Sequence, residues 1–368
     1  MKKRIAHITF DMQMGGAEQV IYNLIENSDH SKYEISIICL DQPVGTYGRQ
    51  LKKQGYELIS FDRKPGFDFQ IIRKIRQYIK NEDIRVLHCH QYTPFIYGTL
   101  ASLFTKTKII FTEHGRFYPD KRRLKRVLIN PVLNLVTDYV TAISAATRIA
   151  LIDNENFPRE KIKLVYNGIN ASSFRRSPYS KLKKDLRIAE DAFLLGTVAR
   201  LDPIKNQKIM IKALKNIHKT YPDTYLIILG DGPERENLQA LTEELGLISR
   251  VIFTGFKTDT ARYYSIMDIF LLTSFSEGTA MTLLEAMASE LPCVVTNVGG
   301  NPEIIINSEN GFVIPSNDEQ ALAKSIITLL GNSELRKKMG RAGRAIFEKK
   351  FTVDRMVSAY ESMYDGNA

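Results

Sequence analysis

The sequence is poor in cysteine and has no long apolar run. Its three cysteines, Cys39, Cys89 and Cys293, lie far apart in 368 residues. That spacing excludes a disulfide scaffold and a Cys-x-x-Cys zinc site, and it fits a reducing compartment. No apolar run approaches the roughly 18 residues that a membrane span needs, and the start of the chain is expected to form a strand rather than a signal peptide.

The composition excludes intrinsic disorder, because 44% of the residues are hydrophobic and only 25% are charged. The positive charge is nevertheless uneven. Residues 1–180 hold 28 basic and 17 acidic residues, a net charge of +11, whereas residues 181–368 hold 23 and 24, a net charge of −1. The whole excess therefore lies in the first half, which indicates an anionic partner there: a nucleic acid, a membrane surface or an acidic substrate.

Short apolar runs alternate with amphipathic helical stretches along the whole chain. Strands are predicted in the first half at 4–10, 34–40, 57–61, 84–88, 108–112, 139–143 and 162–166. The rhythm restarts in the second half, with strands at 193–199, 224–229, 250–254, 268–272, 292–296 and 311–314. Helices are predicted at 16–26, 68–80, 206–220, 234–245, 282–289 and 318–330. This alternation is typical of βαβ units and a parallel sheet.

The length predicts about two domains, at roughly 150 residues each. We expect an α/β fold of two Rossmann-like, doubly wound domains that face each other across a cleft. The polar, turn-rich segment 170–181 is the predicted linker. The predicted domains are therefore 1–172 and 173–350, followed by a helical tail at 351–368. Ligands of such sheets bind at the carboxyl ends of the strands.

The strongest local signal is the segment SEGTAMTLLEAMA, residues 276–288. If its helix begins near Gly278, Glu285 lies about two turns, ~10 Å, further on. The free N–H groups at a helix start suit a phosphate. Glu277 and Glu285 would then accept hydrogen bonds from sugar hydroxyls on both sides of a diphosphate, an arrangement that suits a nucleotide sugar. The alternative is a pair of unrelated acids in an ordinary βα unit.

The segment TVARLDPIKNQ, residues 197–207, places two cations at the end of a predicted strand. Arg200 could donate two parallel hydrogen bonds to a diphosphate, and Lys205 could act on it as a point charge. The alternative is a solvated loop with incidental charges. No Asp-x-Asp pair occurs in the chain, so we predict no bridging divalent metal.

The first predicted βα turn carries Gly15 and Gly16, with Glu18 in the first helical turn. Paired glycines let the backbone approach a ligand closely. The segment is not Gly-x-Gly-x-x-Gly, so a dinucleotide site is unsupported. The alternative is an ordinary glycine-containing turn.

Three of the six histidines are predicted at the carboxyl ends of first-half strands: His88, His90 and His114. His88 and His90 flank Cys89, but no further ligand is spaced in the sequence to join them, so we predict no metal site. His90 is interpreted as a cleft or packing residue. His114 is the better candidate for a site residue, with packing as the alternative.

Taken together and in this order, the motifs resemble the GT-B glycosyltransferases of family 4, the retaining enzymes of bacterial glycan assembly. The resemblance covers nearly the whole chain and rests on GGAE (15–18), TEHG (112–115), NGI (167–169), VARLDPIKN (198–206), GDGP (230–233), FTGF (253–256), SEGTAMTLLEAMA (276–288) and GGNPEII (299–305).

The resemblance implies a role for each matching residue. Arg200 and Lys205 look like the pair that binds the diphosphate, and Gly15 and Gly16 look like the glycine loop beside it. Several further positions match residues that contact the donor or the transferred sugar: His114, Glu277, the backbone of Gly278, Thr279 and Ala280, Glu285 at the ribose, and the backbone around Phe256 and Lys257 at the base. The tail helix would cross back to the first domain.

The resemblance also implies transfer with retention at the anomeric carbon, by front-face attack and without a covalent nucleophile, metal or cofactor. A UDP-hexose or UDP-N-acetylhexosamine is favoured over GDP-mannose as donor. Many relatives have a second glycine or a proline after Glu-Gly, whereas this chain has Thr279 and Ala280. That departure concerns which hexose hydroxyls are recognised.

The excess of basic residues is predicted to serve the acceptor side. Segment 121–136 joins five cations to an apolar stretch, and 71–80 reads as a basic amphipathic helix. Such segments can lie on anionic membranes, or they can be helices with a solvated basic face. We expect a cytoplasmic protein at the inner face of the membrane, acting on a glycan or lipid-linked acceptor. The alternatives are a GT-B sugar-nucleotide epimerase or hydrolase and, remotely, a nucleic-acid-binding protein suggested by the pI of 9.3.

Overall fold

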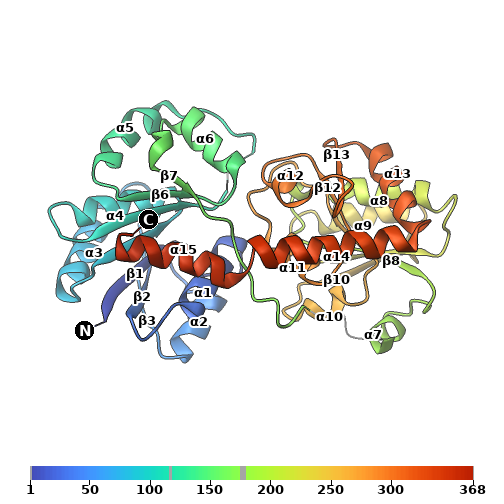
Figure 1. Cartoon of the computed structure of the whole chain (residues 1–368), viewed down its shortest axis with the longest axis horizontal. Coiled ribbons are helices and arrows are strands. Elements are labelled where there is room, and N and C mark those ends of the chain that lie inside the picture. The colour runs from blue at the N-terminus through green and yellow to red at the C-terminus, as the bar shows by residue number, and fades with distance from the viewer. Residues whose placement is uncertain (1, 116–117, 175–179, 368) are drawn as a thin grey trace. The chain divides into compact units, whose positions relative to one another are not determined.

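The computed structural model describes residues 2–115, 118–174 and 180–367, so part of the predicted linker lies outside the described residues. The chain divides into two compact units. The first comprises Met1–Gly168 together with Val353–Ala368, and the second comprises Ile169–Thr352 (Figure 1). Each unit is built on one parallel sheet, so the predicted α/β fold with two Rossmann-like domains is confirmed.

The sheet of unit 1 has seven strands in the order β3-β2-β1-β4-β5-β6-β7. They are β1 Lys3–Thr9, β2 Tyr33–Cys39, β3 Glu57–Ser60, β4 Val86–His90, β5 Lys108–Glu113, β6 Tyr139–Ala142 and β7 Ile162–Leu164. The chain runs outward from β1 to β3 and then returns to β4 on the other side of β1. This reversal makes the β1/β4 boundary a topological switch point, the place where ligands of open α/β sheets bind.

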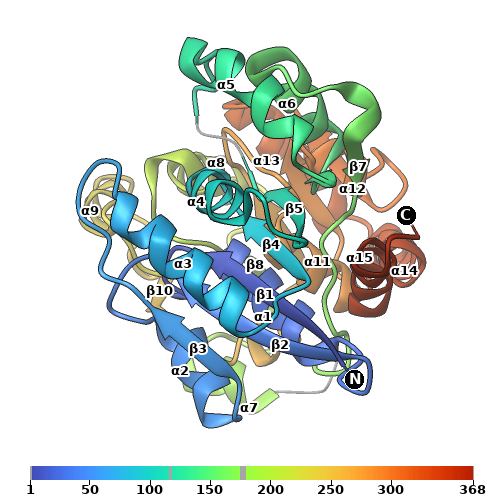
Figure 2. The same cartoon turned by 90° about the vertical axis from the view of Figure 1, so that its left-hand side faces the viewer.

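Helices cover both faces of this sheet (Figure 2). The helices of unit 1 are α1 Gly16–Asn27, α2 Thr46–Lys53, α3 Phe69–Asn81, α4 Tyr92–Ser102, α5 Leu124–Leu135, α6 Ala145–Glu155 and the C-terminal α15 Val353–Asp365, with a short 3-10 helix at Arg159–Lys161. The apolar side of α3 is buried against the sheet in a cluster with residues of α4. On the other side α15 packs beside α1.

Unit 2 repeats the plan with six strands in the order β10-β9-β8-β11-β12-β13. They are β8 Phe193–Val198, β9 Thr224–Leu229, β10 Val251–Gly255, β11 Ile269–Leu272, β12 Cys293–Thr296 and β13 Gly311–Ile314. The helices are α7 Ser180–Asp185, α8 Lys208–Ile217, α9 Arg235–Glu244, α10 Ala261–Tyr264, α11 Met281–Ala288, α12 Asn301–Ile304, α13 Glu319–Leu330 and α14 Ser333–Lys350, with a 3-10 helix at Pro203–Lys205. Its switch point lies between β8 and β11.

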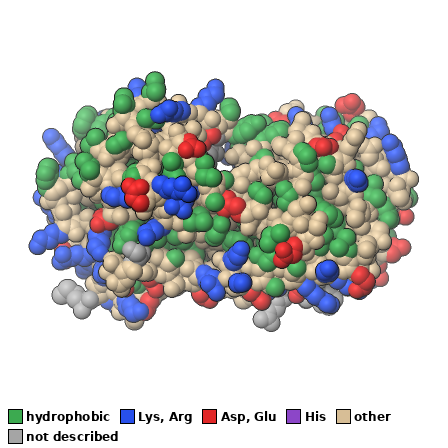
Figure 3. Space-filling model, turned by 45° about the horizontal axis from the view of Figure 1, so that its top comes forward, with side chains coloured by type: hydrophobic (Ala, Val, Ile, Leu, Met, Phe, Trp, Pro, Cys, Tyr) green, Lys and Arg blue, Asp and Glu red, His purple; other side chains and the backbone are tan. Residues whose placement is uncertain are grey.

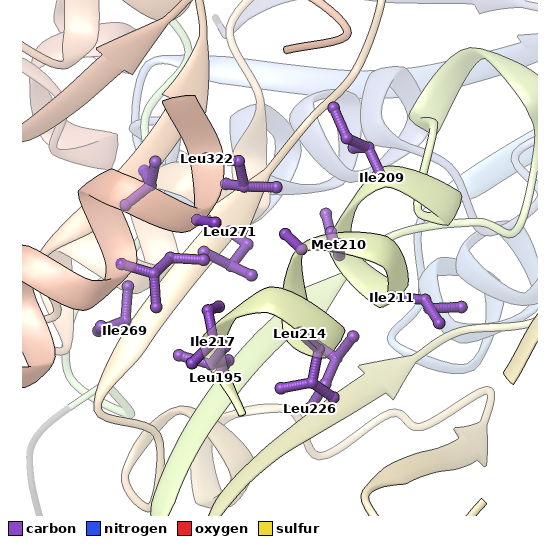
Figure 4. Packing of buried hydrophobic residues seen from close by; sticks show 14 of the residues in the cluster. Leu195, Ile209, Met210, Ile211, Leu214, Ile217, Leu226, Ile269, Leu271 and Leu322 are labelled. Carbon is purple, nitrogen blue, oxygen red and sulfur yellow. The ribbon is translucent and has the colours of Figure 1, made fainter. Parts of the chain in front are cut away.

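The core of unit 2 shows why its helices form where they do. Apolar residues of α8 recur at helical spacing, and Ile211, Leu214 and others point into one cluster with strand residues such as Leu195 and Leu226 (Figure 4). Alternate strand residues project to the same face, so each strand contributes every second side chain to this layer.

Three details differ from the prediction or complete it. The strand predicted at 84–88 is β4, Val86–His90, so His88 and His90 lie inside the strand rather than after it. The three cysteines are free and buried. Among the described residues, no helix has both the length and the apolar character that crossing a membrane requires.

Candidate active site

The switch point of unit 2 brings together the two segments that the sequence singled out there. Arg200 and Lys205 follow β8, and Lys205 ends the 3-10 helix Pro203–Lys205. Glu277 follows β11, the neighbouring strand. The backbone joins the two segments directly, because the N–H of Phe275 donates to the carbonyl of Ile204 at 2.8 Å.

Lys205 and Glu277 form an ion pair at this point. Nζ of Lys205 donates to Oε1 of Glu277 at 2.7 Å, and the hydroxyl of Ser274 donates to the same oxygen at 2.5 Å. Only 8% of the Glu277 side chain and 26% of the Lys205 side chain are exposed. The carboxylate therefore lies largely out of water, where a cation and a hydroxyl are its hydrogen-bond partners.

The backbone of Glu277 is fixed by the glycine pair after β12. The N–H of Gly300 donates to the Glu277 carbonyl at 3.2 Å. Gly299 has φ +49°, and a Cβ there would lie 1.8 Å from the same carbonyl oxygen. Only glycine fits this approach, so Gly299 positions the Glu277 loop.

The helix that carries Glu285 begins at Met281, one residue before its predicted start and three after Gly278, so Glu285 lies just over one turn along α11. Gly278, Thr279 and Ala280 form the loop before it, and no side chain caps the helix N-terminus. Glu285 is 5% exposed. Burial of the Tyr264 hydroxyl raises its pKa, and the Glu285 carboxylate, which is hydrogen-bonded to that hydroxyl, raises it further.

The other predicted residues of unit 2 lie at the same end of the sheet. The Arg200 side chain is 72% exposed, with Nε 3.6 Å from Asp202 Oδ2. Phe256 is exposed and Lys257 is half-buried after β10, which lies two strands from β8. The structure thus joins Lys205 to Glu277, and it leaves the Arg200 guanidinium largely open to solvent.

In unit 1, Gly15 precedes α1 as its N-cap and Gly16 is its first residue. A Cβ at Gly15 would lie 2.3 Å from a carboxylate oxygen of Glu18, so the acid folds back over the helix start. Burial of the Glu18 carboxyl raises its pKa. This turn follows β1, at the switch point of the first sheet.

A pocket of about 440 Å³ opens at the same edge of unit 1. It is lined by Phe10, Ala17, Gln91, Tyr92, Thr93, Glu113, His114, Gly115 and Arg126. Arg126 pairs with the buried Glu155 at 2.6 Å, and its guanidinium carbon lies 3.7 Å from the centre of the Tyr92 ring. One of the five cations of segment 121–136 is therefore turned inward to build the pocket wall.

The predicted histidines do not all lie at the strand ends. His114 follows β5 and lines the pocket, whereas His88 and His90 are buried within β4. His7 of β1 joins them, because His7 pairs in register with His88. Burial lowers the pKa of His7 and His114 to about 3 and holds the pKa of His88 and His90 well below the usual value, so all four rings are neutral.

The tail helix satisfies the polar atoms beside these rings. The hydroxyl of Tyr364 lies 2.9 Å from His88 Nδ1, and Thr112 Oγ1 lies 2.7 Å from His88 Nε2. Tyr360 lies 3.2 Å from Thr112 and 3.3 Å from Thr141. The polar side chains of the sheet at His88, Thr112 and Thr141 are thus covered by α15 rather than by solvent.

The statement that no further ligand joins His88 and His90 is wrong. One nitrogen each of His7, His88 and His90 lies within 4.8 Å of the others, a grouping that could hold a metal ion. Both nitrogens of His88 already have hydrogen-bond partners, and His7 Nδ1 lies 2.9 Å from His90 Nε2. The rings are therefore hydrogen-bonded to protein atoms, and an ion would have to replace several of these bonds.

Sequence reasoning missed four residues that build the two sites: His7, Ser274, Gly299 and Arg126. The alternation in Ala6-His7-Ile8 and Leu87-His88-Cys89-His90 was a signal for His7, because it places the three imidazoles on one face of neighbouring strands. Ser274 and Gly299 act through tertiary contacts with Glu277, for which the local sequence carried no signal.

Comparison with known proteins finds similarity over most of the chain. Residues 14–173 match the family described as Glycosyltransferase Family 4, and residues 179–346 match the family described as Glycosyl transferases group 1. The EpsD protein of Bacillus subtilis is 31% identical over 82% of this chain and 84% of its own. The UDP-Gal:alpha-D-GlcNAc-diphosphoundecaprenol alpha-1,3-galactosyltransferase of Escherichia coli is 24% identical over 91% and 89%. The crystal structure of Anabaena HepE in complex with UDP superposes with a TM-score of 0.87 at 24% identity, covering 99% of this chain and all of that one.

Proposed function

Since the chain belongs to the family 4 glycosyltransferases of the GT-B fold, we propose that it transfers a hexose or N-acetylhexosamine from a UDP-sugar with retention at the anomeric carbon. The enzyme class and a place in bacterial glycan or glycoconjugate assembly follow from the family. The UDP-sugar, preferred here over GDP-mannose, is supported by the UDP bound in the HepE structure.

The observation that carries the proposal is the Lys205–Glu277 pair at the switch point of unit 2. An exposed arginine, Arg200, precedes it, and the uncapped start of α11 follows it. In the proposed mechanism Arg200, Lys205 and the N–H groups at the start of α11 hold the diphosphate. The Lys205–Glu277 pair places the positive charge where the leaving group develops negative charge.

The remaining predicted residues complete the donor site in this proposal. Glu277 contacts the transferred sugar together with the backbone of Gly278, Thr279 and Ala280, and Glu285 binds the ribose hydroxyls. The other contacts are proposed from matching positions: Gly15 and Gly16 beside the diphosphate, His114 beside the sugar, and Phe256 and Lys257 at the base. No metal ion or cofactor takes part, because the cations and helix start supply the compensating charge.

The course of the reaction follows from these positions. The acceptor hydroxyl attacks from the face on which the diphosphate leaves, and a phosphate oxygen takes its proton. The bond from the anomeric carbon to the phosphate oxygen breaks as the new glycosidic bond forms, and no enzyme carboxylate forms a covalent intermediate.

Lys205→Ala tests this proposal against Lys208→Ala, a nearby exposed lysine at the start of α8. Loss of one preorganised donor to a developing charge lowers kcat by about 100-fold, so transfer by Lys205→Ala should fall by that order. Lys208→Ala should transfer at the wild-type rate. Unchanged turnover of Lys205→Ala with UDP-sugar and acceptor would remove the pair from the mechanism.

We further propose that the acceptor is lipid-linked and that unit 1 meets it on an anionic membrane at the cytoplasmic face. The related Escherichia coli enzyme is named for a diphosphoundecaprenol-linked acceptor. In this chain the two basic segments singled out in the sequence, 71–80 and 121–136, differ. The apolar side of α3, with Ile71, Ile75 and Ile79, is buried in the core, although Phe69 at its start is exposed. Of the two helices, α5 therefore offers the larger apolar surface.

Six large apolar side chains on α5 and at its end are 45–80% exposed. They are Leu124, Leu128, Ile129, Val132, Leu135 and Val136, with Leu128 75% and Leu135 80% exposed. Four exposed cations lie at the start of the helix: Lys121, Arg122, Arg123 and Lys125. Hydrophobic and basic side chains gather on the upper left of the molecule in Figure 3, where Figure 1 shows α5. Near an anionic surface the cations contribute about 1 kcal/mol each.

Vesicle co-sedimentation tests the α5 face with Leu128→Ser/Leu135→Ser, and Ile248→Ser serves as control because Ile248 is an exposed apolar residue of unit 2. Two buried leucines contribute about 3 kcal/mol, so the double variant should bind anionic vesicles about 100-fold more weakly. The control should bind as wild type, and neutral vesicles should bind poorly. Equal binding of the double variant and wild type would contradict the assignment.

A further inference from the structure

Three imidazoles form an unbroken line across unit 1. His7 Nδ1 lies 2.9 Å from His90 Nε2, and His90 Nδ1 lies 2.8 Å from His114 Nε2. The rings of His7 and His90 are stacked, with centroids 5.2 Å apart, and those of His90 and His114 are stacked at 5.1 Å. The line runs from the interior of the sheet to the residue that lines the pocket.

The hydrogen-bond pattern permits two proton arrangements. A neutral imidazole carries one N–H and one bare nitrogen, and each of the two contacts joins an Nδ1 to an Nε2. If His90 donates from Nδ1 to His114, it must accept at Nε2 from His7, and all three rings then carry the hydrogen on Nδ1. If His114 donates from Nε2, all three rings carry it on Nε2.

The ends of the line are the two nitrogens that have no hydrogen-bond partner among the described residues. They are His7 Nε2 in the interior and Nδ1 of His114, the residue that lines the pocket, and both atoms are buried. Because His114 Nε2 is engaged by His90, Nδ1 is the ring nitrogen left for a ligand. A change of the line from one arrangement to the other takes up a proton at one end and releases one at the other.

We infer that His7 and His90 are positioning residues, which fix the ring and the hydrogen of His114 so that its Nδ1 is offered to a sugar hydroxyl in the pocket. This inference rests on the proposed function, in which His114 lies beside the transferred sugar. His7 and His90 act through His114 and do not touch the substrate.

His88 is buried beside these rings but is not part of the line, so burial alone does not place a histidine in it. Its two nitrogens are engaged by Tyr364 and Thr112, so it lies outside the line of three rings although its ring centroid is 4.1 Å from that of His90. His88 is therefore an internal reference for a histidine that only completes the packing beneath α15.

Nitrogen-15 NMR of the histidine-labelled wild-type protein tests the line without any substitution, since the two tautomers differ in their nitrogen shifts. His7, His90 and His114 should carry the hydrogen at the same ring position, all Nδ1 or all Nε2. A mixed pattern would overturn the inference. A shift of these signals on addition of stoichiometric Zn²⁺ would also overturn it, because a metal ion bound to the rings breaks the line.

Kinetics of two variants test the functional part. In His7→Asn the amide stands near the position of Nδ1 and can still bond to His90, whereas His7→Leu ends the line. We expect His7→Leu to change the His114 nitrogen shifts and to lower kcat by about 10-fold or more, with the KM for donor little changed because the proposed ribose and base contacts lie in unit 2. His7→Asn should restore both readouts, and His30→Asn, outside the line, should change neither.

The outcomes separate this inference from the proposed function. Coupled tautomers in a protein without transferase activity would refute the function and leave the line intact. Active enzyme with mixed tautomers, or with unchanged His114 shifts and kcat in His7→Leu, would refute the line alone. If His7→Leu fails to fold, the wild-type tautomers and His7→Asn still decide the question.

Discussion

Mild acid should destabilise unit 1, because four of its histidines, three of them buried and His114 half-buried, stay neutral in the fold. Burial lowers the pKa of His7 and His114 to about 3, and it also lowers the pKa of His88 and His90. Each group has an unfolded pKa of about 6.5. Below that pH the unfolded chain binds more protons than the folded one, so the free energy of unfolding falls as the pH falls.

The size of the effect follows from the same linkage. Between pH 7.5 and 5.5 each neutral buried histidine lowers the free energy of unfolding by about 1.4 kcal/mol, and four together lower it by about 5 kcal/mol. Since domains are stable by about 5–15 kcal/mol, this is a large part of the total. His7→Asn removes one of the four groups, so the free energy of unfolding of this variant should fall by about 4 kcal/mol over the same pH range.

Hydrogen exchange followed by mass spectrometry measures the two units separately. Peptides from β4 report unit 1, and peptides from β9, Thr224–Leu229, which contain no histidine, serve as the control in unit 2. After correction for intrinsic exchange, β4 protection should fall by the stated free energy and β9 protection should change much less. A change below about 1 kcal/mol in β4 would refute the reasoning that the four rings are neutral.

Two further variants test the donor site. Gly299→Ala should destabilise unit 2 by more than about 2 kcal/mol and abolish transfer, because its Cβ meets the Glu277 carbonyl. Gly246→Ala is the control in denaturant unfolding, since Gly246 also has a positive φ but open space around it, and it should cost about 1 kcal/mol. Glu285→Gln should raise the KM for donor about 10-fold with little change in kcat, as loss of one charged hydrogen bond predicts. The control is Glu244→Gln, which changes an exposed acid of α9. Wild-type kinetics of Glu285→Gln would remove Glu285 from the ribose site.

The strands and the Rossmann-like plan could be predicted because both depend on local patterns. The runs at 224–229 and 311–314 coincide with β9 and β13, and most others differ by one or two residues. The end of β4 was placed two residues early, because Cys89 and His90 continue the strand where polar residues suggested a loop. That error moved His88 and His90 from the interior of the sheet to its edge.

The parts of the site that could not be predicted depend on tertiary contacts. The sequence indicated that Lys205 and Glu277 act together, but the ion pair between them follows from the adjacency of β8 and β11. Periodicity identified α3 as a basic amphipathic helix, and composition marked segment 121–136 as basic and apolar. Neither pattern could show that the apolar side of α3 is buried and that of α5 exposed. Likewise, His7 acquires a partner only because β1 pairs with β4.

The most direct test of the central claim is proton NMR of the reaction of UDP-sugar with a lipid-linked or synthetic glycan acceptor, followed in real time. We expect the first product to carry the anomeric configuration of the donor and its formation to require acceptor. Lys205→Ala should slow its formation by about 100-fold, and Lys208→Ala should form it at the wild-type rate. An inverted first product, or release of free or epimerised sugar at the same rate without acceptor, would contradict it.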